Sequence, residues 1–199
     1  NIKRVWRGDE RERADAKRRL GLTTTIGNPG SYAPLAYGQT TDKSCGIATQ
    51  VQVLKAHNLL PAGDPRPQET ALIEEAERRG FKKPGEGTSP EMKGQLLLAR
   101  GLLLNKRANA SWSELEDAIL RQNIVLVGVD VRFLWSGYET RPRRASHDLL
   151  VTGAELDSRT KEMLGVYIND SGDDPPKGGL FVPVGQFKKA FTGDFAEIR

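Results

Sequence analysis

The chain has 199 residues, of which 37% are hydrophobic and 28% charged, and its formal net charge is +4. This composition allows one buried core under a solvated, mildly basic surface, so we expect one main domain. A single cysteine excludes an internal disulfide, the lack of a run of about 18 apolar residues excludes a membrane span, and the charged N-terminus shows no signal peptide. Because the chain begins with Asn1 rather than methionine, we expect a processed product or a domain of a longer protein.

The first part of the chain is charged and then irregular. Residues 4–20 are mostly helix formers and stop at Gly21, which predicts a helix that lies on the surface or serves as a linker. Residues 21–38 are rich in glycine, proline, threonine and tyrosine and indicate an extended loop. We therefore divide the chain into a charged segment, 1–21, and a domain, 22–199.

Four helices are predicted in the next part of the domain, over 44–59, 67–79, 89–100 and 111–120. Apolar residues recur at helical spacing in the first two segments. Ser89-Pro90 is a typical start for the third, and Gly101 a typical end. Ser111 with Glu114 three residues later is a capping box for the fourth.

The second half of the domain changes from helical to β-rich patterns. Strands are predicted over 123–131, 147–153, 162–170 and 180–183, followed by a short helix over 184–191. A polar, turn-like segment separates 147–153 from 162–170, so these two strands should form a hairpin. Helices followed by an antiparallel sheet indicate an α+β fold.

Cys45 lies at the predicted start of helix 44–59. A lone cysteine is often just a small buried hydrophobe. A helix N-terminus, however, favours negative charge, and a thiolate is the nucleophilic form of cysteine. If Asp42 or Ser44 caps this helix, Cys45 is a candidate nucleophile.

Such a nucleophile needs an imidazole base, and the chain has only two histidines. His57 follows Cys45 by twelve residues on the same predicted helix, about 18 Å along its axis, which is too far for a hydrogen bond. We interpret His57 as a polar surface residue near the helix end. His147, at the start of a strand, is therefore the candidate base.

The base in turn needs a group that orients its ring, and the developing oxyanion needs donors. The strand paired with His147 ends in Asn169-Asp170, a sequence that is also common in ordinary turns. Because strand side chains alternate between faces, only one of them can point at His147. We favour Asp170, with Asn169 as the alternative. The backbone N–H of Cys45 and the side-chain amide of Gln39 are candidate oxyanion donors.

The order Gln39, Cys45-Gly46, His147 and Asp170 resembles the papain-like cysteine peptidase superfamily. Within it, the chain looks closest to the bacterial double-glycine leader peptidase domains that process bacteriocins. The resemblance covers about residues 35 to 191. It departs from the family at Ser44, where an aspartate is common, and at Ser171, where a proline often follows the catalytic aspartate.

This resemblance implies a papain-like fold, with the nucleophile helix in an N-terminal helical half packed on a C-terminal antiparallel sheet. It implies a cysteine peptidase with a Cys-His-Asp mechanism, a glutamine oxyanion donor, a protein or peptide substrate and a preference for cleavage after Gly-Gly. A free peptidase domain with a charged arm also looks like bacterial toxin domains. That likeness implies a larger secreted or delivered protein, action in the cytoplasm of a target cell (otherwise in its own cytoplasm) and a cognate immunity protein.

Two other hypotheses stay open at this stage. The same residues would also serve a transglutaminase-like enzyme or a deamidase, which acts on a glutamine side chain. Alternatively, the chain is a non-catalytic binding module that uses the basic first twenty residues and the run Arg141, Arg143 and Arg144 on an acidic partner. No cofactor is expected. One cysteine and two distant histidines do not have the spacing of metal ligands, so no metal site is expected. The sequence shows no basic groove with interleaved aromatic residues, so nucleic-acid binding is not expected either.

Overall fold

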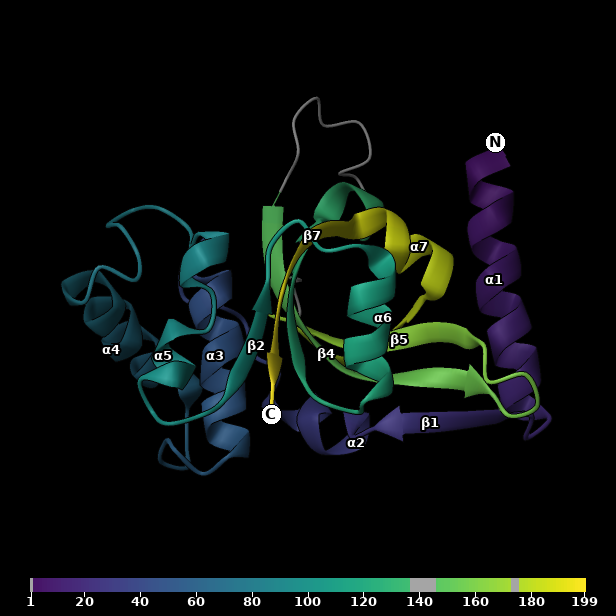
Figure 1. The fold of residues 1–199 in the computed structure, drawn as a ribbon, viewed down its shortest axis with the longest axis horizontal. Helices are drawn as coiled ribbons and strands as arrows, with labels where there is room; N and C mark the ends of the chain where they lie inside the picture. The colour runs from purple at the N-terminus through teal and green to yellow at the C-terminus, as the bar shows by residue number, and fades with distance from the viewer. Residues whose placement is uncertain (1, 137–145, 173–175) are drawn as a thin grey trace.

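A seven-stranded antiparallel sheet with helices on both faces forms the molecule (Figure 1). The structure is a computed structural model that describes residues 2–136, 146–172 and 176–199, with side chains from residue 10 onward. The strands, in their order across the sheet, are β2 (Leu104–Arg107), β7 (Phe191–Ile198), β3 (Val125–Asp130), β4 (Ser146–Asp157), β5 (Met163–Asp170) and β6 (Lys177–Pro183). β1 (Thr23–Gly27) pairs with the last residues of β4.

Helices cover the two faces of this sheet separately. On one face lie α6 (Trp112–Leu120) and α7 (Val184–Ala190), and on the other α3 (Cys45–Ala56), α4 (Pro65–Arg78) and α5 (Gln95–Leu98). The short elements are α2 (Pro29–Tyr32) and the 3-10 turns η1 (Ala33–Leu35), η2 (Pro90–Met92) and η3 (Val131–Phe133). Each face therefore has its own apolar core.

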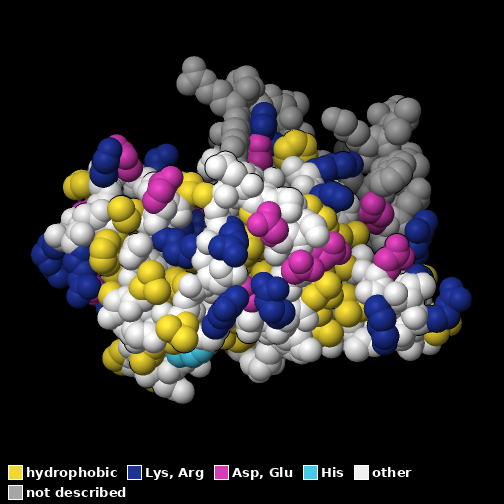
Figure 2. Space-filling view, in the orientation of Figure 1, with side chains coloured by type: hydrophobic (Ala, Val, Ile, Leu, Met, Phe, Trp, Pro, Cys, Tyr) yellow, Lys and Arg dark blue, Asp and Glu magenta, His cyan; other side chains and the backbone are white. Residues whose placement is uncertain are grey.

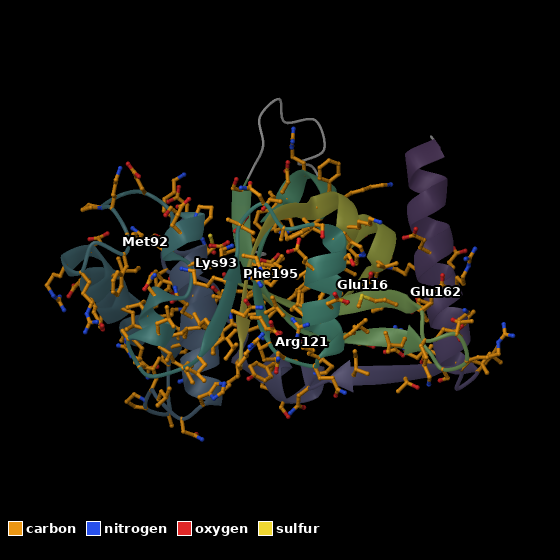
Figure 3. All side chains as sticks on the ribbon, viewed as in Figure 1. Met92, Lys93, Glu116, Arg121, Glu162 and Phe195 are labelled. Carbon is orange, nitrogen blue, oxygen red and sulfur yellow. The ribbon has the colours of Figure 1, made fainter. Side chains whose placement is uncertain are left out.

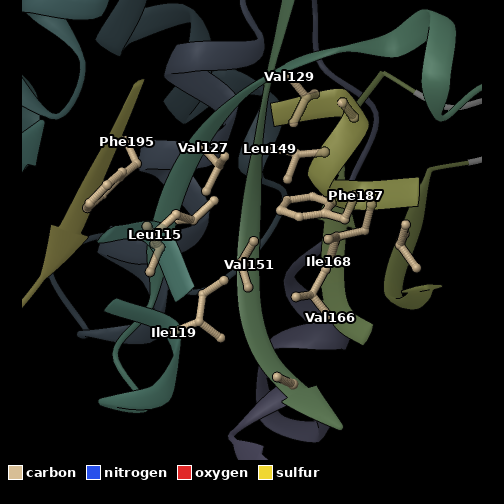
Figure 4. Close-up of a cluster of buried hydrophobic side chains, with 14 of the residues drawn as sticks. Leu115, Ile119, Val127, Val129, Leu149, Val151, Val166, Ile168, Phe187 and Phe195 are labelled. Atoms are coloured by element: carbon tan, nitrogen blue, oxygen red, sulfur yellow. The ribbon is translucent and has the colours of Figure 1, made fainter. Parts of the chain in front are cut away.

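The core under α6 and α7 shows how strand alternation builds these layers. Val127 of β3 and Leu149 of β4 point toward Leu115 of α6 and Phe187 of α7 (Figure 4). The intervening strand residues, such as Leu126, point to the α3 face. Period-2 alternation thus fixes which strand side chains can meet on one face of the sheet.

Several predicted elements are confirmed. Helices lie where segments 4–20, 44–59, 67–79, 111–120 and 184–191 predicted them, within a few residues. The hairpin of 147–153 and 162–170 is confirmed, since β4 and β5 pair antiparallel. The capping box is also present: Glu114 N–H donates to Ser111 Oγ at 3.3 Å, and Ser111 N–H donates to Glu114 Oε2 at 2.8 Å.

Two local predictions are wrong. Segment 89–100 is not one helix but the turn η2 followed by the short α5. Gly94 between them has φ of 79°, in the left-handed region that ends a helix. Residues 21–38 are not simply a loop, because Thr23–Gly27 form β1 on β4. The threonines of this segment favour a strand, and pairing with the long strand β4 outweighs the turn-like composition around them.

α1 (Ile2–Arg19) stands beside the sheet near β5 and β6 (Figure 1). Its residue Ala14 is buried, Arg11 donates to the Phe181 carbonyl at 2.8 Å, and Lys17 forms an ion pair with Asp157. Arg18 stacks over the Phe181 ring at 4.7 Å. This helix is therefore packed on the domain, and a boundary near residue 21 stays a prediction.

Candidate active site

Cys45 is the first residue of α3 and is partly exposed. Ser44 occupies the N-cap position, but neither Ser44 nor Asp42 caps the helix with its side chain. Instead, Ser44 Oγ donates to the Thr41 carbonyl at 2.9 Å and accepts from Thr41 N–H at 3.0 Å. The serine therefore holds the incoming loop, and the sulfur lies at a helix N-terminus without a side-chain cap.

His147 is held between Cys45 and Asp170. Its Nε2 lies 2.8 Å from Asp170 Oδ1, and it lines the same cavity as Cys45. Burial would lower the pKa of His147, but the hydrogen bonds and charges of Asp170 and Cys45 outweigh it and raise that pKa to about 10. The imidazole is therefore protonated at neutral pH and carries its own counter-ion.

Asp170, rather than Asn169, faces the imidazole. Asp170 lies on the same sheet face as His147, whereas Asn169 faces the other way, where its Nδ2 donates to Gln52 Oε1 at 2.9 Å and to the Tyr32 carbonyl at 2.7 Å. Burial raises the pKa of Asp170, but the hydrogen bonds from His147, Gly172 and Trp135 lower it overall. Strand alternation thus separates an orienting carboxylate from a structural amide.

Trp135 is a site residue that the sequence does not reveal. Its Nε1 donates to Asp170 Oδ2 at 2.7 Å, and its ring centroid lies 5.0 Å from that of His147. Gly172 fits beneath both rings, because an added Cβ would lie 2.7 Å from Trp135 and 2.8 Å from His147 Cε1. These contacts fix the carboxylate and cover the His147–Asp170 hydrogen bond.

The backbone carrying Trp135 is anchored at three points beyond the end of β3. Asp130 Oδ1 accepts from Arg132 N–H at 3.1 Å, and Trp135 N–H donates to the Val131 carbonyl at 2.8 Å. Gln186 Nε2 of α7 donates to the Phe133 carbonyl, also at 2.8 Å. The position of the indole therefore depends on a distant helix, α7, as well as on the local turn, so no local pattern predicts it.

Gln39 lies next to the residue that follows Asp170. Its N–H donates to the Ser171 carbonyl and its Oε1 accepts from Ser171 Oγ, each at 3.0 Å. Its Nε2 donates to the Thr41 carbonyl at 2.7 Å, which uses one of two amide hydrogens. Gln39 lines a hollow of about 510 Å³ with Ser171 and Gly172, whereas Cys45 opens on a different cavity of about 240 Å³.

Other predicted residues lie away from this constellation or outside the described part. His57 is exposed at the C-cap of α3, at the opposite end from Cys45. The run Arg141, Arg143 and Arg144 lies outside the described residues. On the face that Figure 2 shows, acidic and basic side chains are interspersed.

Neither a metal centre nor a membrane span is found in the described part of the chain. Over residues 2–136, 146–172 and 176–199, no three His, Cys, Asp or Glu side chains gather in a way that could hold a metal ion. Within the same ranges, no helix combines the length and apolar character needed to cross a bilayer.

Comparison with known proteins identifies the fold. No family model and no curated protein matches the chain by sequence. Among solved structures, the chain is similar to the peptidase domain of Streptococcus ComA, a bifunctional ABC transporter of a quorum-sensing pathway (14% identity, 84% of this chain and 97% of that one, TM-score 0.54). It is also similar to a double-glycine-motif protease from an AMS/PCAT transporter, solved with its leader peptide (15% identity, 82% and 91%, TM-score 0.52).

A third similar structure is described as a C39-like peptidase from Bacillus anthracis (14% identity, 88% and 98%, TM-score 0.52). Each match covers nearly the whole of the other chain. The predicted fold class is therefore confirmed: the chain has the papain-like fold of C39-like double-glycine peptidase domains. At this level of identity the likeness establishes the fold alone.

Proposed function

We propose that this chain is a cysteine peptidase in which Cys45 is the nucleophile, His147 the acid–base group and Asp170 the orienting carboxylate. The observation that carries the proposal is the position of the imidazole, which is hydrogen-bonded to Asp170 and lines the same cavity as Cys45. A cationic imidazole beside a thiol favours the thiolate, which is the attacking form of cysteine. The likeness to peptidase domains supports the same reading.

In the proposed reaction, the Cys45 sulfur attacks the scissile carbonyl carbon and forms a C–S bond while the C=O electrons move to oxygen. His147 then gives its proton to the leaving nitrogen as the C–N bond breaks, which releases the amine and leaves a thioester. Water attacks the thioester with His147 as general base, and the sulfur leaves as thiolate to complete hydrolysis. Asp170 keeps the imidazole in one orientation throughout.

The oxyanion formed in each attack needs donors in place beforehand. The backbone N–H of Cys45, at the start of α3, is one proposed donor. Gln39 is the other, through the amide hydrogen that its bond to Thr41 leaves over. Ser171 supports this assignment because it holds both the backbone and the side chain of Gln39 next to Asp170.

A peptide substrate follows from the same likeness, since one similar protein was solved with a leader peptide. Cleavage after small residues such as Gly-Gly is accordingly the first specificity to test. Wild type is incubated with peptides containing Gly-Gly, and products are identified by mass spectrometry. We expect fragments from wild type and His57→Ala, and none from Cys45→Ala or His147→Ala; cleavage that survives in Cys45→Ala would contradict the proposal.

The same experiment separates peptidase from acyl transfer at a glutamine side chain. Fragments indicate peptide-bond hydrolysis, whereas a mass change without fragments indicates a deamidase or a transglutaminase-like enzyme. An intact peptide with a changed mass would therefore replace the peptidase proposal but retain the proposed roles of Cys45 and His147.

We further propose, as the setting of this activity, a delivered antibacterial toxin domain with a neutralising immunity protein. Expression of wild type in bacteria, with Cys45→Ala as the matched control, tests this setting. Growth arrest by wild type alone is expected. Equal growth of both strains, with soluble protein present in both, would contradict it.

A further inference from the structure

Glu69 is a carboxylate buried in the helical half of the molecule. It belongs to α4, which packs on the outer side of α3, away from the sheet (Figure 3). The exposed fraction of Glu69 is 0%. Removing a charged carboxylate from water costs several kcal/mol, so a buried one needs a partner that explains its place.

That partner is the backbone of the loop that leads to Cys45. Thr40 N–H donates to both Glu69 Oε1 and Glu69 Oε2, each at 3.1 Å. This N–H belongs to the peptide bond between Gln39 and Thr40. Arg66, one turn earlier on α4, is exposed and pairs with Asp64 at 3.7 Å instead. The Glu69 carboxylate therefore holds the backbone directly beside the proposed oxyanion donor.

The peptide that Glu69 holds sets the direction of the Gln39 amide. Gln39 Nε2 donates to the Thr41 carbonyl at 2.7 Å, and this bond fixes where the remaining amide hydrogen points. The same carbonyl accepts from Ser44 Oγ at 2.9 Å, immediately before the candidate nucleophile. A shift of the Gln39–Thr40 peptide would therefore move both the base of the Gln39 side chain and the acceptor that aims it.

The rest of the loop is fixed by other means. Before Gln39, Tyr37 is buried in the apolar core on the α3 face. Burial raises the pKa of Tyr37, and the charge of Glu69 raises it further, so this phenol stays protonated at neutral pH. Ser171 holds Gln39 itself through two hydrogen bonds of 3.0 Å. After Gln39, the hydrogen bonds of Thr40 to Glu69 complete the clamp.

We propose that Glu69 is a positioning residue for the oxyanion donor: it holds the Gln39–Thr40 peptide so that the free Gln39 amide hydrogen is aimed at the developing oxyanion. The inference rests on the proposed function and adds to it a residue outside the Cys45–His147–Asp170 set. Oxyanion donors stabilise the transition state because they are fixed in place beforehand. A displaced Gln39 should therefore lower kcat and kcat/KM together and leave KM nearly unchanged.

A double-mutant cycle tests whether Glu69 acts through Gln39. Glu69→Leu removes both acceptor oxygens, and Glu69→Gln keeps one of them. With the peptide that wild type cleaves best, we expect Glu69→Leu to lower kcat about 10- to 100-fold, and Glu69→Gln to lower it less. In the Gln39→Ala background, Glu69→Leu should change kcat by less than about threefold, because the group that Glu69 positions is gone. The full loss in both backgrounds would overturn the inference.

Alkylation of Cys45 separates positioning from general damage to the site. Iodoacetamide loses iodide when a thiolate attacks its CH₂ group, and no oxyanion forms, so this reaction does not need Gln39. Wild type, Glu69→Leu and Gln39→Ala should be alkylated at equal rates at pH 6. Glu74→Leu, the same change at an exposed position of α4, should match wild type in cleavage and in alkylation. Slow alkylation of Glu69→Leu would overturn the inference, since the nucleophile itself would then depend on Glu69.

The conservative variant keeps the test decisive where folding fails. If circular dichroism shows that Glu69→Leu does not fold, Glu69→Gln, which preserves the shape of the side chain, replaces it throughout. An unchanged kcat in folded Glu69→Gln would then overturn the inference.

NMR of the Gln39 side-chain amide reports its position without any substrate. Its ¹⁵N signal is assigned by its absence from Gln39→Ala. We expect a rigid amide in wild type and Glu74→Leu, and a lower heteronuclear NOE, which reports fast motion, in the Glu69 variant. An equally rigid amide in that variant would overturn the inference.

These outcomes distinguish the role of Glu69 from the peptidase proposal. An amide that loses its order in the Glu69 variant, with no cleavage of any peptide by wild type, would support the role of Glu69 and overturn the peptidase. Cleavage by the Glu69 variant with the kcat of wild type would do the reverse.

Discussion

Replacing Asp170 with asparagine tests the electrostatics of the site most fully. The substitution keeps the shape of the side chain but removes the charge that faces His147 Nε2 at 2.8 Å. The fold raises the pKa of His147 from 6.5 to about 10, which corresponds to about 5 kcal/mol at about 1.36 kcal/mol per pKa unit. Without Asp170, the burial that lowers this pKa is opposed by Cys45 alone, so we expect it to fall by several units.

The sign of the accompanying stability change follows from linkage. Because the folded pKa of His147 lies above the unfolded one, its contribution to folding is complete below pH 6.5 and is lost as the pH rises toward about 10. Asp170→Asn should therefore cost several kcal/mol in the free energy of unfolding at pH 6, and less as the pH approaches 10. Chemical denaturation at both pH values measures this difference.

The pKa itself is measured by NMR titration of the histidine ring signals, of which there are only two. His57→Gln assigns the signal of the exposed histidine and leaves that of His147. Asp117→Asn on α6 is the control for loss of a carboxylate elsewhere. A His147 pKa that stays near 10 in Asp170→Asn would refute the view that this carboxylate holds the imidazolium.

Three further substitutions follow from contacts around the site. Trp135→Phe removes the indole N–H that donates to Asp170 Oδ2, so it should lower the free energy of unfolding by about 1–3 kcal/mol and reduce peptide cleavage. Undiminished cleavage would show that the indole does not position Asp170. Gly46→Ala places a Cβ 2.7 Å from Asp148 Oδ2 and should cost about 1–3 kcal/mol in denaturation experiments, while Gly30→Ala, with no atom within 4 Å, should not share that loss. Lys93→Met leaves the carboxylates of Asp148 and Asp194 without their shared ammonium and should cost about 3–5 kcal/mol, so an unchanged melting temperature would contradict the ion-pair geometry.

The part of the site that sequence predicts depends on short-range rules. A rise of 1.5 Å per helical residue separates His57 from Cys45, and the structure places them at opposite ends of α3. Strand alternation predicts that one of Asn169 and Asp170 faces His147, and Asp170 is the one that does. Such rules depend on the residues of a single element and therefore carry over directly from sequence to structure.

The rest of the site depends on contacts between distant segments. Trp135 reaches Asp170 from the segment after η3, and Lys93 meets Asp194 across 101 positions of sequence. Lys93 also falls inside a segment with helical composition, although burial between two carboxylates and the turn at Gly94 interrupt that helix. No local pattern carries this information.

Strands β2 and β7 illustrate the same limit in the sheet. β7 passes through Thr192-Gly193-Asp194, a sequence typical of a turn, yet it lies between β2 and β3. Its end is fixed by Glu197, which accepts from Arg121 at 2.7 and 2.8 Å and from Asn105 at 2.9 Å. The hydrogen bond from Arg121 is the main cause that lowers the pKa of Glu197 to about 2. Pairing on both sides and an ion pair between the buried Glu197 and the exposed Arg121 thus outweigh local propensity.

The most direct test of the central claim needs no substrate. The rate at which iodoacetamide alkylates Cys45 at pH 6 is compared between wild type and His147→Ala, with His57→Ala as the control for loss of a histidine elsewhere. If a cationic His147 activates the sulfur, wild type and His57→Ala are labelled rapidly, and His147→Ala is labelled slowly. Equal rates in all three proteins would contradict a nucleophilic Cys45–His147 pair, and with it every enzymatic reading of this site.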